Sequence, residues 1–145
     1  MTHTEIKLEH NWRQKTLENL EKDIWDKPDF ESHLAKRCYE LRKVTLNKFT
    51  AEDLRIMIGQ QIGLKYLVPL AIETLIKDIF SEGDLYPGDL LKTLLLVDTN
   101  YWEEHKEYWK QVDDLIKDRR QELIKTKIPT DKFDSYIKKN NKSGC

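Results

Sequence analysis

The stretch AEDLRIMIGQQIGLKYLVPL, residues 51–70, combines large apolar side chains with two glycines four positions apart. Three structures use such a pattern: a phosphate-binding glycine loop, a pair of helices packed in a membrane, or two soluble helices separated by a glycine stop. No β-branched strand precedes the glycines, and no GK[ST] or GxGxxG signature is present, which argues against phosphate binding. Arg55 and Lys65 flank the glycines, and these charges argue against a helix pair within a membrane. The stretch therefore predicts two packed soluble helices.

Local signals place the ends of the first of these helices. Thr50 with Asp53 resembles a capping box at its start. Gly63 is placed to end it in a left-handed conformation, and Gly59 lets a neighbouring helix approach closely. Gln61 falls on the apolar face of the helix, so we expect its amide to be buried and to hydrogen-bond to another helix or a loop.

The next helix is predicted to begin near residues 65–68, because Pro69 is tolerated in a first turn, where its missing N–H has no helical partner. Apolar side chains cover more than half of its circumference, so we expect it to be the central helix. On the other side of the opening stretch, Ser32 is placed to cap a helix whose apolar stripe includes Leu34 and Cys38.

Toward the C-terminus, Asn100 with Glu103 resembles a second capping box, which opens a long helix with one apolar stripe. Thr130 is placed to cap a short final helix. No alternating segment is long enough to predict a strand, so the predicted fold class is all-α, a single compact bundle of about six to eight helices. Its parts are a central apolar helix at about 66–80, a long C-terminal helix at about 101–125, and loosely ordered ends at 1–15 and 140–145.

Composition restricts the function. Lys and Arg number 25 against 26 Asp and Glu, and the net charge of -1 provides no general positive field for nucleic acid. Residues 45–100 are the acidic part, with 5 basic and 8 acidic groups. No segment approaches the roughly 18–20 apolar residues of a membrane span, and the first thirty residues contain no apolar block of signal-peptide length. We expect a cytoplasmic protein that binds neither nucleic acid nor membranes.

Two blocks of sequence carry a family resemblance. FTAEDLRIMIGQQIGLKYLVPLAIETL, residues 49–75, and EGDLYPGDLL, residues 82–91, resemble the immunity proteins of bacterial contact-dependent growth inhibition systems. The resemblance covers roughly residues 17–116. It implies a small cytoplasmic protein, not an enzyme, whose partner is the C-terminal toxin domain of a cognate effector, frequently a nuclease. The quoted residues have packing explanations, so the resemblance does not locate the toxin contacts.

The histidines and cysteines give little support to a catalytic or metal site. No Glu-x-x-His pair and no HExxH motif accompanies the four histidines. His105 lies on an apolar stripe and is expected to donate one hydrogen bond at the edge of the core. Cys38 points inward and is expected to be a packed side chain rather than a nucleophile. We therefore expect no catalytic residue, no metal and no cofactor.

The candidate toxin-binding residues form two groups. In the first, Glu82, Asp84, Tyr86 and Asp89 combine acid with an aromatic ring in the turn-rich loop 81–89, which would complement a basic catalytic cleft. The alternative for this group is that its acids cap the following helix, as Asp89 is placed to do, while Tyr86 packs on the core.

The second group is Trp102 with Glu103 and the adjoining Glu104, where a half-exposed tryptophan would serve as an interface anchor. The alternative is a tryptophan that covers the edge of the core. Trp25, which lies among Asp23, Asp26 and Asp29, is a weaker candidate of the same kind.

The hypothesis from the sequence is inhibition by occlusion, in which acidic and aromatic groups dock on the positively charged substrate site of the toxin. The alternative is a helical adaptor or regulatory protein that binds another protein partner. A neighbouring gene that encodes a toxin discriminates between them.

Overall fold

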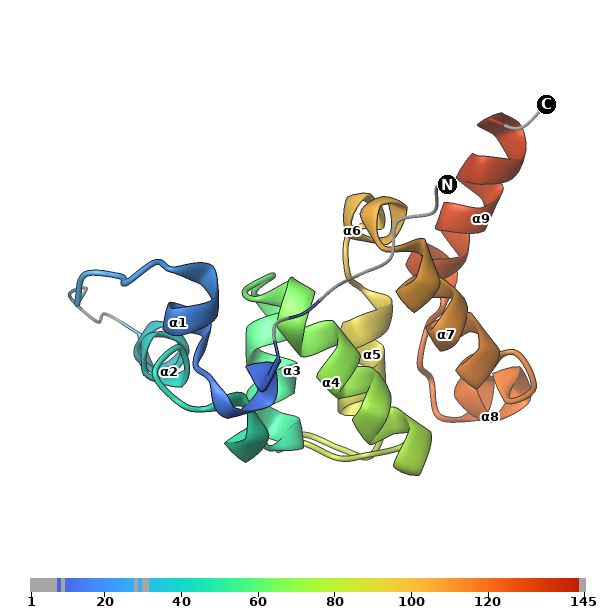
Figure 1. The fold of residues 1–145 in the computed structure, drawn as a ribbon. Coiled ribbons are helices and arrows are strands. Elements are labelled where there is room, and N and C mark those ends of the chain that lie inside the picture. The colour runs from blue at the N-terminus through green and yellow to red at the C-terminus, as the bar shows by residue number, and fades with distance from the viewer. Residues whose placement is uncertain (1–7, 9, 28, 30–31, 144–145) are drawn as a thin grey trace.

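The computed structural model describes residues 8, 10–27, 29 and 32–143 of the 145, with side chains through residue 137. Regular structure within these residues consists of helices, apart from an isolated bridge between Glu82 and Pro87 (Figure 1). The elements are η1 (Trp12–Gln14), α1 (Leu17–Glu21), α2 (His33–Leu41), η2 (Leu46–Lys48), α3 (Ala51–Gly59), α4 (Leu64–Lys77), α5 (Asp89–Leu95), α6 (Thr99–Glu104), α7 (Lys106–Ile116), α8 (Arg120–Lys125) and α9 (Asp131–Ser143). The all-α prediction is confirmed.

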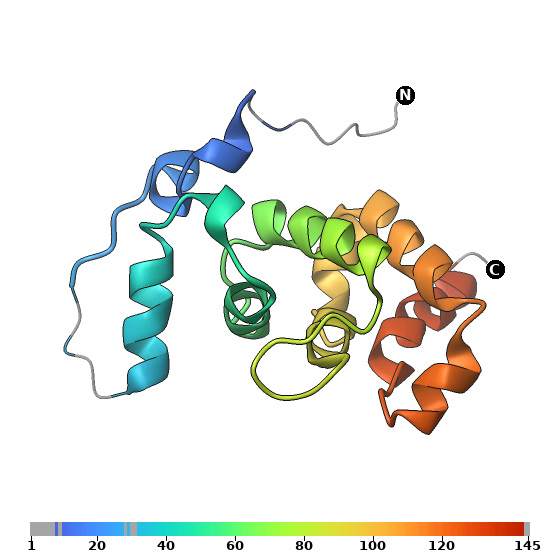
Figure 2. The ribbon, with the colours of Figure 1, turned by 90° about the horizontal axis from the view of Figure 1, so that it is seen from below.

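Helices α3, α4 and α5 pack against one another at the centre of the molecule. Helix α2 contacts α3 on one side, and α7 contacts α4 on the other (Figures 1 and 2). Helix α6 joins this second side to α9. The chain thus runs from one end of the bundle to the other, and the loop between α4 and α5 crosses its central part.

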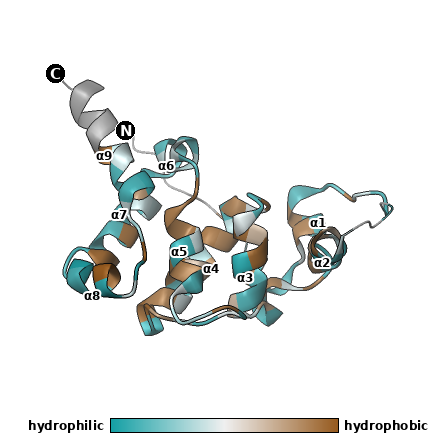
Figure 3. Cartoon of the chain, turned by 180° about the vertical axis from the view of Figure 1, so that it is seen from behind, coloured by the Kyte–Doolittle hydropathy of each residue, from teal (hydrophilic) through white to brown (hydrophobic). Residues whose placement is uncertain are grey.

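The core is built around α4, as its apolar pattern predicts. Leu67, Val68 and Ala71 have no exposed surface, and apolar residues are concentrated along α4 and α5 in Figure 3. The helix begins at Leu64, so Pro69 is its sixth residue and not part of a first turn, contrary to the prediction. Proline removes the hydrogen bond to the carbonyl four residues earlier, and that carbonyl belongs to an exposed residue, where water can satisfy it.

The connection between α3 and α4 differs from the prediction. Gln61, with φ of 60°, is the left-handed residue that ends α3. The N–H of Gln61 donates to Ile58 and that of Ile62 donates to Met57, both at 2.9 Å, which is a Schellman motif. Gly63 is also left-handed, but it precedes α4 as its N-cap. Gln61 is exposed, so the predicted burial of its amide is wrong, because the helix ends before its position can join the apolar face.

The start of α3 agrees with the prediction. The side chain of Thr50 accepts from the N–H of Asp53 at 3.1 Å, and the carboxylate of Asp53 accepts from the N–H of Thr50 at 3.0 Å. Ser32 likewise caps α2 through the N–H of Ala35. A Cβ added at Gly59 would lie 3.6 Å from Thr93 of α5, an ordinary contact distance, so the packing of α5 there does not require glycine.

The single helix predicted at about 101–125 is wrong, because three helices cover this range. The first break is at His105, with φ of -137° and ψ of 57°. Its Nδ1 lies 3.0 Å from the carbonyl oxygen of Tyr101, and its ring stacks on that tyrosine with the centroids 4.2 Å apart. The partly buried position agrees with the core-edge prediction for His105. The break allows α6 to pack on both α7 and α9.

The second predicted capping box does not form. Helix α6 begins at Thr99, and Asp98 occupies the N-cap position without a side-chain hydrogen bond to the helix. Asn100 therefore lies inside the helix rather than before it.

Buried aromatic residues lie near both ends of the described chain. Trp12 in η1 is buried, and α9 continues to Ser143 with Phe133 and Tyr136 buried. Residues 1–7, 9 and 144–145 of the ranges predicted to be loosely ordered lie outside the described residues. Among the helices described, none has the length and apolar character needed to cross a bilayer.

Candidate functional site

The loop 81–89 between α4 and α5 is closed at its base. The N–H of Gly88 donates to the carbonyl oxygen of Phe80 at 3.1 Å, and Glu82 forms a bridge with Pro87. Gly88 has a φ of 93°, and a Cβ added there would lie 2.7 Å from Ile128, which follows α8. The turn therefore needs glycine at this position, both for the backbone conformation and for space.

Asp89 holds the loop from inside. It is 2% exposed at the start of α5, and its carboxylate accepts the N–H groups of Gly83 at 2.7 Å, Leu85 at 3.0 Å and Tyr86 at 3.4 Å. Its position at the start of the helix also favours a negative charge, and Arg55 Nε lies 3.8 Å away. Asp89 therefore fixes the loop rather than capping α5, whose N-cap is Gly88 without a side-chain hydrogen bond, and its side chain offers almost no surface to a partner.

A second carboxylate ties the loop to α3. Glu52 Oε1 accepts the N–H of Asp84 at 2.8 Å, and both oxygens of Glu52 receive hydrogen bonds from Arg55, at 2.6 and 2.5 Å. The guanidinium of Arg55 lowers the pKa of Glu52 despite the opposing effect of burial, so this carboxylate stays ionised at neutral pH. The pKa of Arg55 is raised by the same pair.

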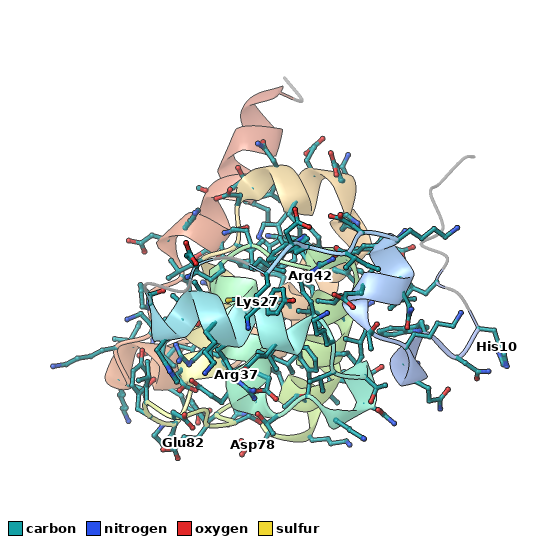
Figure 4. All side chains as sticks on the ribbon, turned by 90° about the vertical axis from the view of Figure 1, so that its left-hand side faces the viewer. His10, Lys27, Arg37, Arg42, Asp78 and Glu82 are labelled. Atoms are coloured by element: carbon teal, nitrogen blue, oxygen red, sulfur yellow. The ribbon has the colours of Figure 1, made fainter. Side chains whose placement is uncertain are left out.

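The tip of the loop faces solvent. Glu82 and Asp84 are exposed, Leu85 is 60% exposed and Tyr86 is 37% exposed. Figure 4 shows Glu82 together with Asp78, at the end of α4, along one edge of the molecule. Tyr86 has Lys92 Nζ 5.9 Å from its ring centroid and is not part of the core. We call Glu82, Asp84, Leu85 and Tyr86 the acidic loop tip.

Leu85 was not among the residues predicted from the sequence. A signal for it exists, because this leucine lies between Asp84 and Tyr86 in a turn-rich segment, where no helical stripe can bury it. The predicted site therefore gains an exposed apolar side chain beside its acids.

The second predicted group is arranged differently from the expectation. Trp102 has no exposed surface, and its ring packs edge-on against Phe133 with the centroids 5.5 Å apart. The predicted half-exposure is therefore wrong, because α9 covers this side of α6. Glu103 is exposed and lies 3.6 Å from Lys106. Figure 1 places α6 and the loop between α4 and α5 on opposite sides of the molecule, so the two groups do not form one surface.

Trp25, the weaker candidate predicted from the sequence, packs on a buried arginine. The guanidinium of Arg42 lies 4.2 Å from the ring centroid of Trp25, and Trp25 Nε1 donates to Asp23 at 3.2 Å. Arg42 is itself buried, and it donates to the Glu21 carboxylate and to the backbone carbonyl of Asp23. Sequence reasoning missed Arg42, because nothing local distinguishes it from the exposed basic residues near it (Figure 4).

Within the described part of the chain, no three His, Cys, Asp or Glu side chains are grouped so that they could hold a metal ion. Cys38 is buried, and burial raises the pKa of its thiol, which disfavours the reactive thiolate. The carboxylates at the base of the loop are occupied by N–H and guanidinium donors. This arrangement holds the surface of the loop in place.

Part of the chain matches a known protein family. A family model described as CDI immunity proteins matches residues 19–112, which run from α1 into α7 and include the whole loop 81–89. Searches of curated proteins and of solved structures found no match.

Proposed function

The chain belongs to the CDI immunity proteins, and from this membership we propose that it binds a cognate toxin domain in the cytoplasm and occludes its active site. Its role is that of an immunity protein; the toxin, in this proposal, is a nuclease and the inhibitor is not an enzyme. The observation that carries the proposal is the acidic loop tip, which is held rigidly to α3 and α5 and presents its side chains to solvent.

The negative charge of the acidic loop tip is complementary to the positively charged cleft expected of a nuclease. An enzyme that holds a nucleic-acid backbone needs a positively charged cleft, since the phosphates dominate the affinity. Glu82 and Asp84 are exposed carboxylates without a basic residue between positions 78 and 91 of the chain. Such a group would be attracted to the same cleft and would compete with phosphates for it.

The anchoring of the loop contributes to affinity in a second way. Asp89 and Glu52 together accept four backbone N–H groups of the loop, so little conformational entropy remains to be lost when a partner binds. Leu85 and Tyr86 then supply apolar and aromatic surface, the kind of side chain that slows dissociation when it becomes buried. Charge would accelerate association and these two residues would prolong the complex.

The test is co-purification of this protein with the toxin domain encoded immediately upstream of it, followed by calorimetry and a toxin activity assay. We expect a nanomolar dissociation constant, which corresponds to a standard binding free energy of about -12 kcal/mol. An equimolar amount of the inhibitor should abolish the activity of the toxin. A Leu85→Ala/Tyr86→Ala variant should bind at least about tenfold more weakly, whereas Ile124→Ala, an exposed residue outside the family match, should bind as the wild type does.

Absence of a complex, with helical circular dichroism showing that the protein is folded, would contradict the proposal. The helical adaptor would then be the better explanation of the same surface.

A further inference from the structure

Two adjoining hollows lie between α2 and α3. The first, of about 510 Å³, is lined by Trp25, Leu34, Ala35, Cys38 and Ile62 among others. The second, of about 620 Å³, is lined by Leu34, Ile56 and Asp84 together with the charged residues of α3. Leu34 lines both hollows, and we call the two together the α2–α3 groove.

The first hollow is mostly apolar and partly open, whereas the second is lined mainly by polar and charged residues. Leu34 is 42% exposed, although it belongs to the apolar stripe of α2. Trp25 is exposed to a similar degree at one end, and Ile56 is partly buried at the other. Hollows of several hundred Å³ with such a lining are of the size that accepts a whole side chain of a partner.

The charges inside the groove are already paired. Arg37 Nη2 lies 2.9 Å from Asp53 Oδ1, and Arg55 forms the two hydrogen bonds to Glu52 described above. Two further carboxylates line the groove, Asp26 in the first hollow and Asp84 in the second, and both are exposed. Asp26 therefore adjoins the apolar first hollow, and Asp84 adjoins the more polar second one.

We propose that the α2–α3 groove receives an apolar side chain of the toxin domain, carried on a segment with basic residues on both sides of it. The apolar first hollow selects the central side chain, and Asp26 and Asp84 select the flanking charges. The inference rests on the proposed function, because Asp84 belongs both to the groove and to the acidic loop tip. The toxin would therefore contact one surface that runs from loop 81–89 over α2.

Two variants test whether the apolar first hollow receives the side chain. Leu34→Gln keeps the length and helix propensity of the side chain but removes its apolar character, and Ala35→Trp fills the first hollow from an exposed position. Each should raise the calorimetric dissociation constant for the toxin domain by about tenfold or more. The matched control is Ile124→Gln on α8, where the isoleucine is 68% exposed and away from the groove; it should leave the constant within about twofold.

The flanking charges are tested separately by association kinetics. Asp26→Asn and Asp84→Asn should each slow association by several-fold at low salt, and the difference should shrink at high salt, whereas Asp118→Asn, also exposed, should not. Normal association of both groove variants would overturn the assignment of a basic segment.

The outcomes separate this inference from the proposed function. If the wild type forms the complex and Leu34→Gln and Ala35→Trp bind it equally well, the groove assignment is wrong while the immunity function stands. If the wild type does not bind, both are wrong. Self-association of the wild type that Leu34→Gln abolishes would assign the groove to a second copy of the chain and would also overturn the inference.

Discussion

Two residues between α3 and α4 adopt the left-handed conformation, and only Gly63 lacks a side chain. At Gly63 an added Cβ would lie 2.8 Å from a methyl group of Leu17, whereas at Gly59 it would meet only Thr93 at 3.6 Å. Gln61 adopts the same backbone conformation from an exposed position, where a side chain meets no obstacle. The requirement for glycine thus comes from the packing of α1, which the sequence around residue 63 does not reveal.

Alanine substitutions distinguish the two glycines. Gly63→Ala should lower the free energy of unfolding by about 2 kcal/mol or more, since a left-handed alanine costs roughly 1–2 kcal/mol and the contact with Leu17 adds to it. Gly59→Ala should be neutral or stabilise by up to about 1 kcal/mol, because alanine is the better helix former. Urea unfolding followed by circular dichroism measures both, and equal effects at the two positions would contradict this explanation.

At the same scale, three residues of the candidate site illustrate how burial decides a role. Asp89 and Glu82 belong to one acidic loop, yet Asp89 accepts three N–H groups inside it while Glu82 faces solvent. Trp102 is covered by Phe133 of α9, a residue outside the family match. A toxin-binding role remains a prediction for the exposed acids, and for Asp89 and Trp102 the structure supplies internal roles instead.

At the scale of elements, the loop 81–89 depends on an ionised anchor in another helix. Arg55 holds the pKa of Glu52 below its usual value of 4.5, so the unfolded state binds a proton at higher pH than the folded state does. The stabilisation from Glu52 is therefore fully present above about pH 4.5 and is lost as the pH falls through the lower folded-state pKa.

Replacement of this anchor has a pH-dependent effect. Glu52→Gln should unfold at lower temperature than the wild type at neutral pH, and the difference in Tm should shrink as the pH falls through the lowered folded-state pKa of Glu52, because the wild-type carboxyl then becomes protonated too. Scanning calorimetry across this range measures it, with Glu104→Gln, an exposed residue on α6, as the control. A difference in Tm that is constant with pH would show that the charge of Glu52 does not hold the loop.

The helices after residue 98 show the limit of periodicity at this scale. An apolar stripe continues through α6, α7 and α8, because each helix buries one face, and a stripe by itself does not reveal a change of direction. The break at His105 depends on stacking with Tyr101 and on the contact of α6 with α9. The periodic pattern contains no information about these contacts, so it could not predict the break.

At the scale of the whole molecule, the acidic residues act through their distribution. The net charge is only -1, but the middle of the chain carries the excess of acid, and the fold brings part of it to the exposed loop tip. Electrostatic attraction of a basic partner depends on such a local field rather than on the total charge. Glu103, on the opposite side, would not contribute to the same contact (Figure 1).

Charge reversal tests this distribution. Glu82→Lys/Asp84→Lys should reduce the association rate constant for the toxin domain by about tenfold or more at low salt, with a smaller effect at high salt, because screening weakens the attraction. Asp118→Lys/Glu122→Lys changes the net charge equally from exposed positions outside the family match and should have little effect. Stopped-flow fluorescence measures both rates, and equal slowing by the two variants would mean that only total charge matters.

The sequence by itself determined the helical class, the capped starts of α2 and α3, the central position of α4 and the family. These depend on residues within one or two helical turns, or on a pattern repeated along one face. It also identified the loop with the exposed acids Glu82 and Asp84, because turn residues and charge leave such a segment outside the core.

Only the tertiary structure decided which members of the candidate site face solvent. Asp89 is buried beside Arg55 of α3, and Trp102 is buried under Phe133 of α9, so elements from distant parts of the chain remove both from the surface. The groove between α2 and α3 and the buried Arg42 arise in the same way. Burial depends on contacts between residues far apart in sequence, whereas caps and stripes depend on neighbours, and a single sequence records only the latter directly.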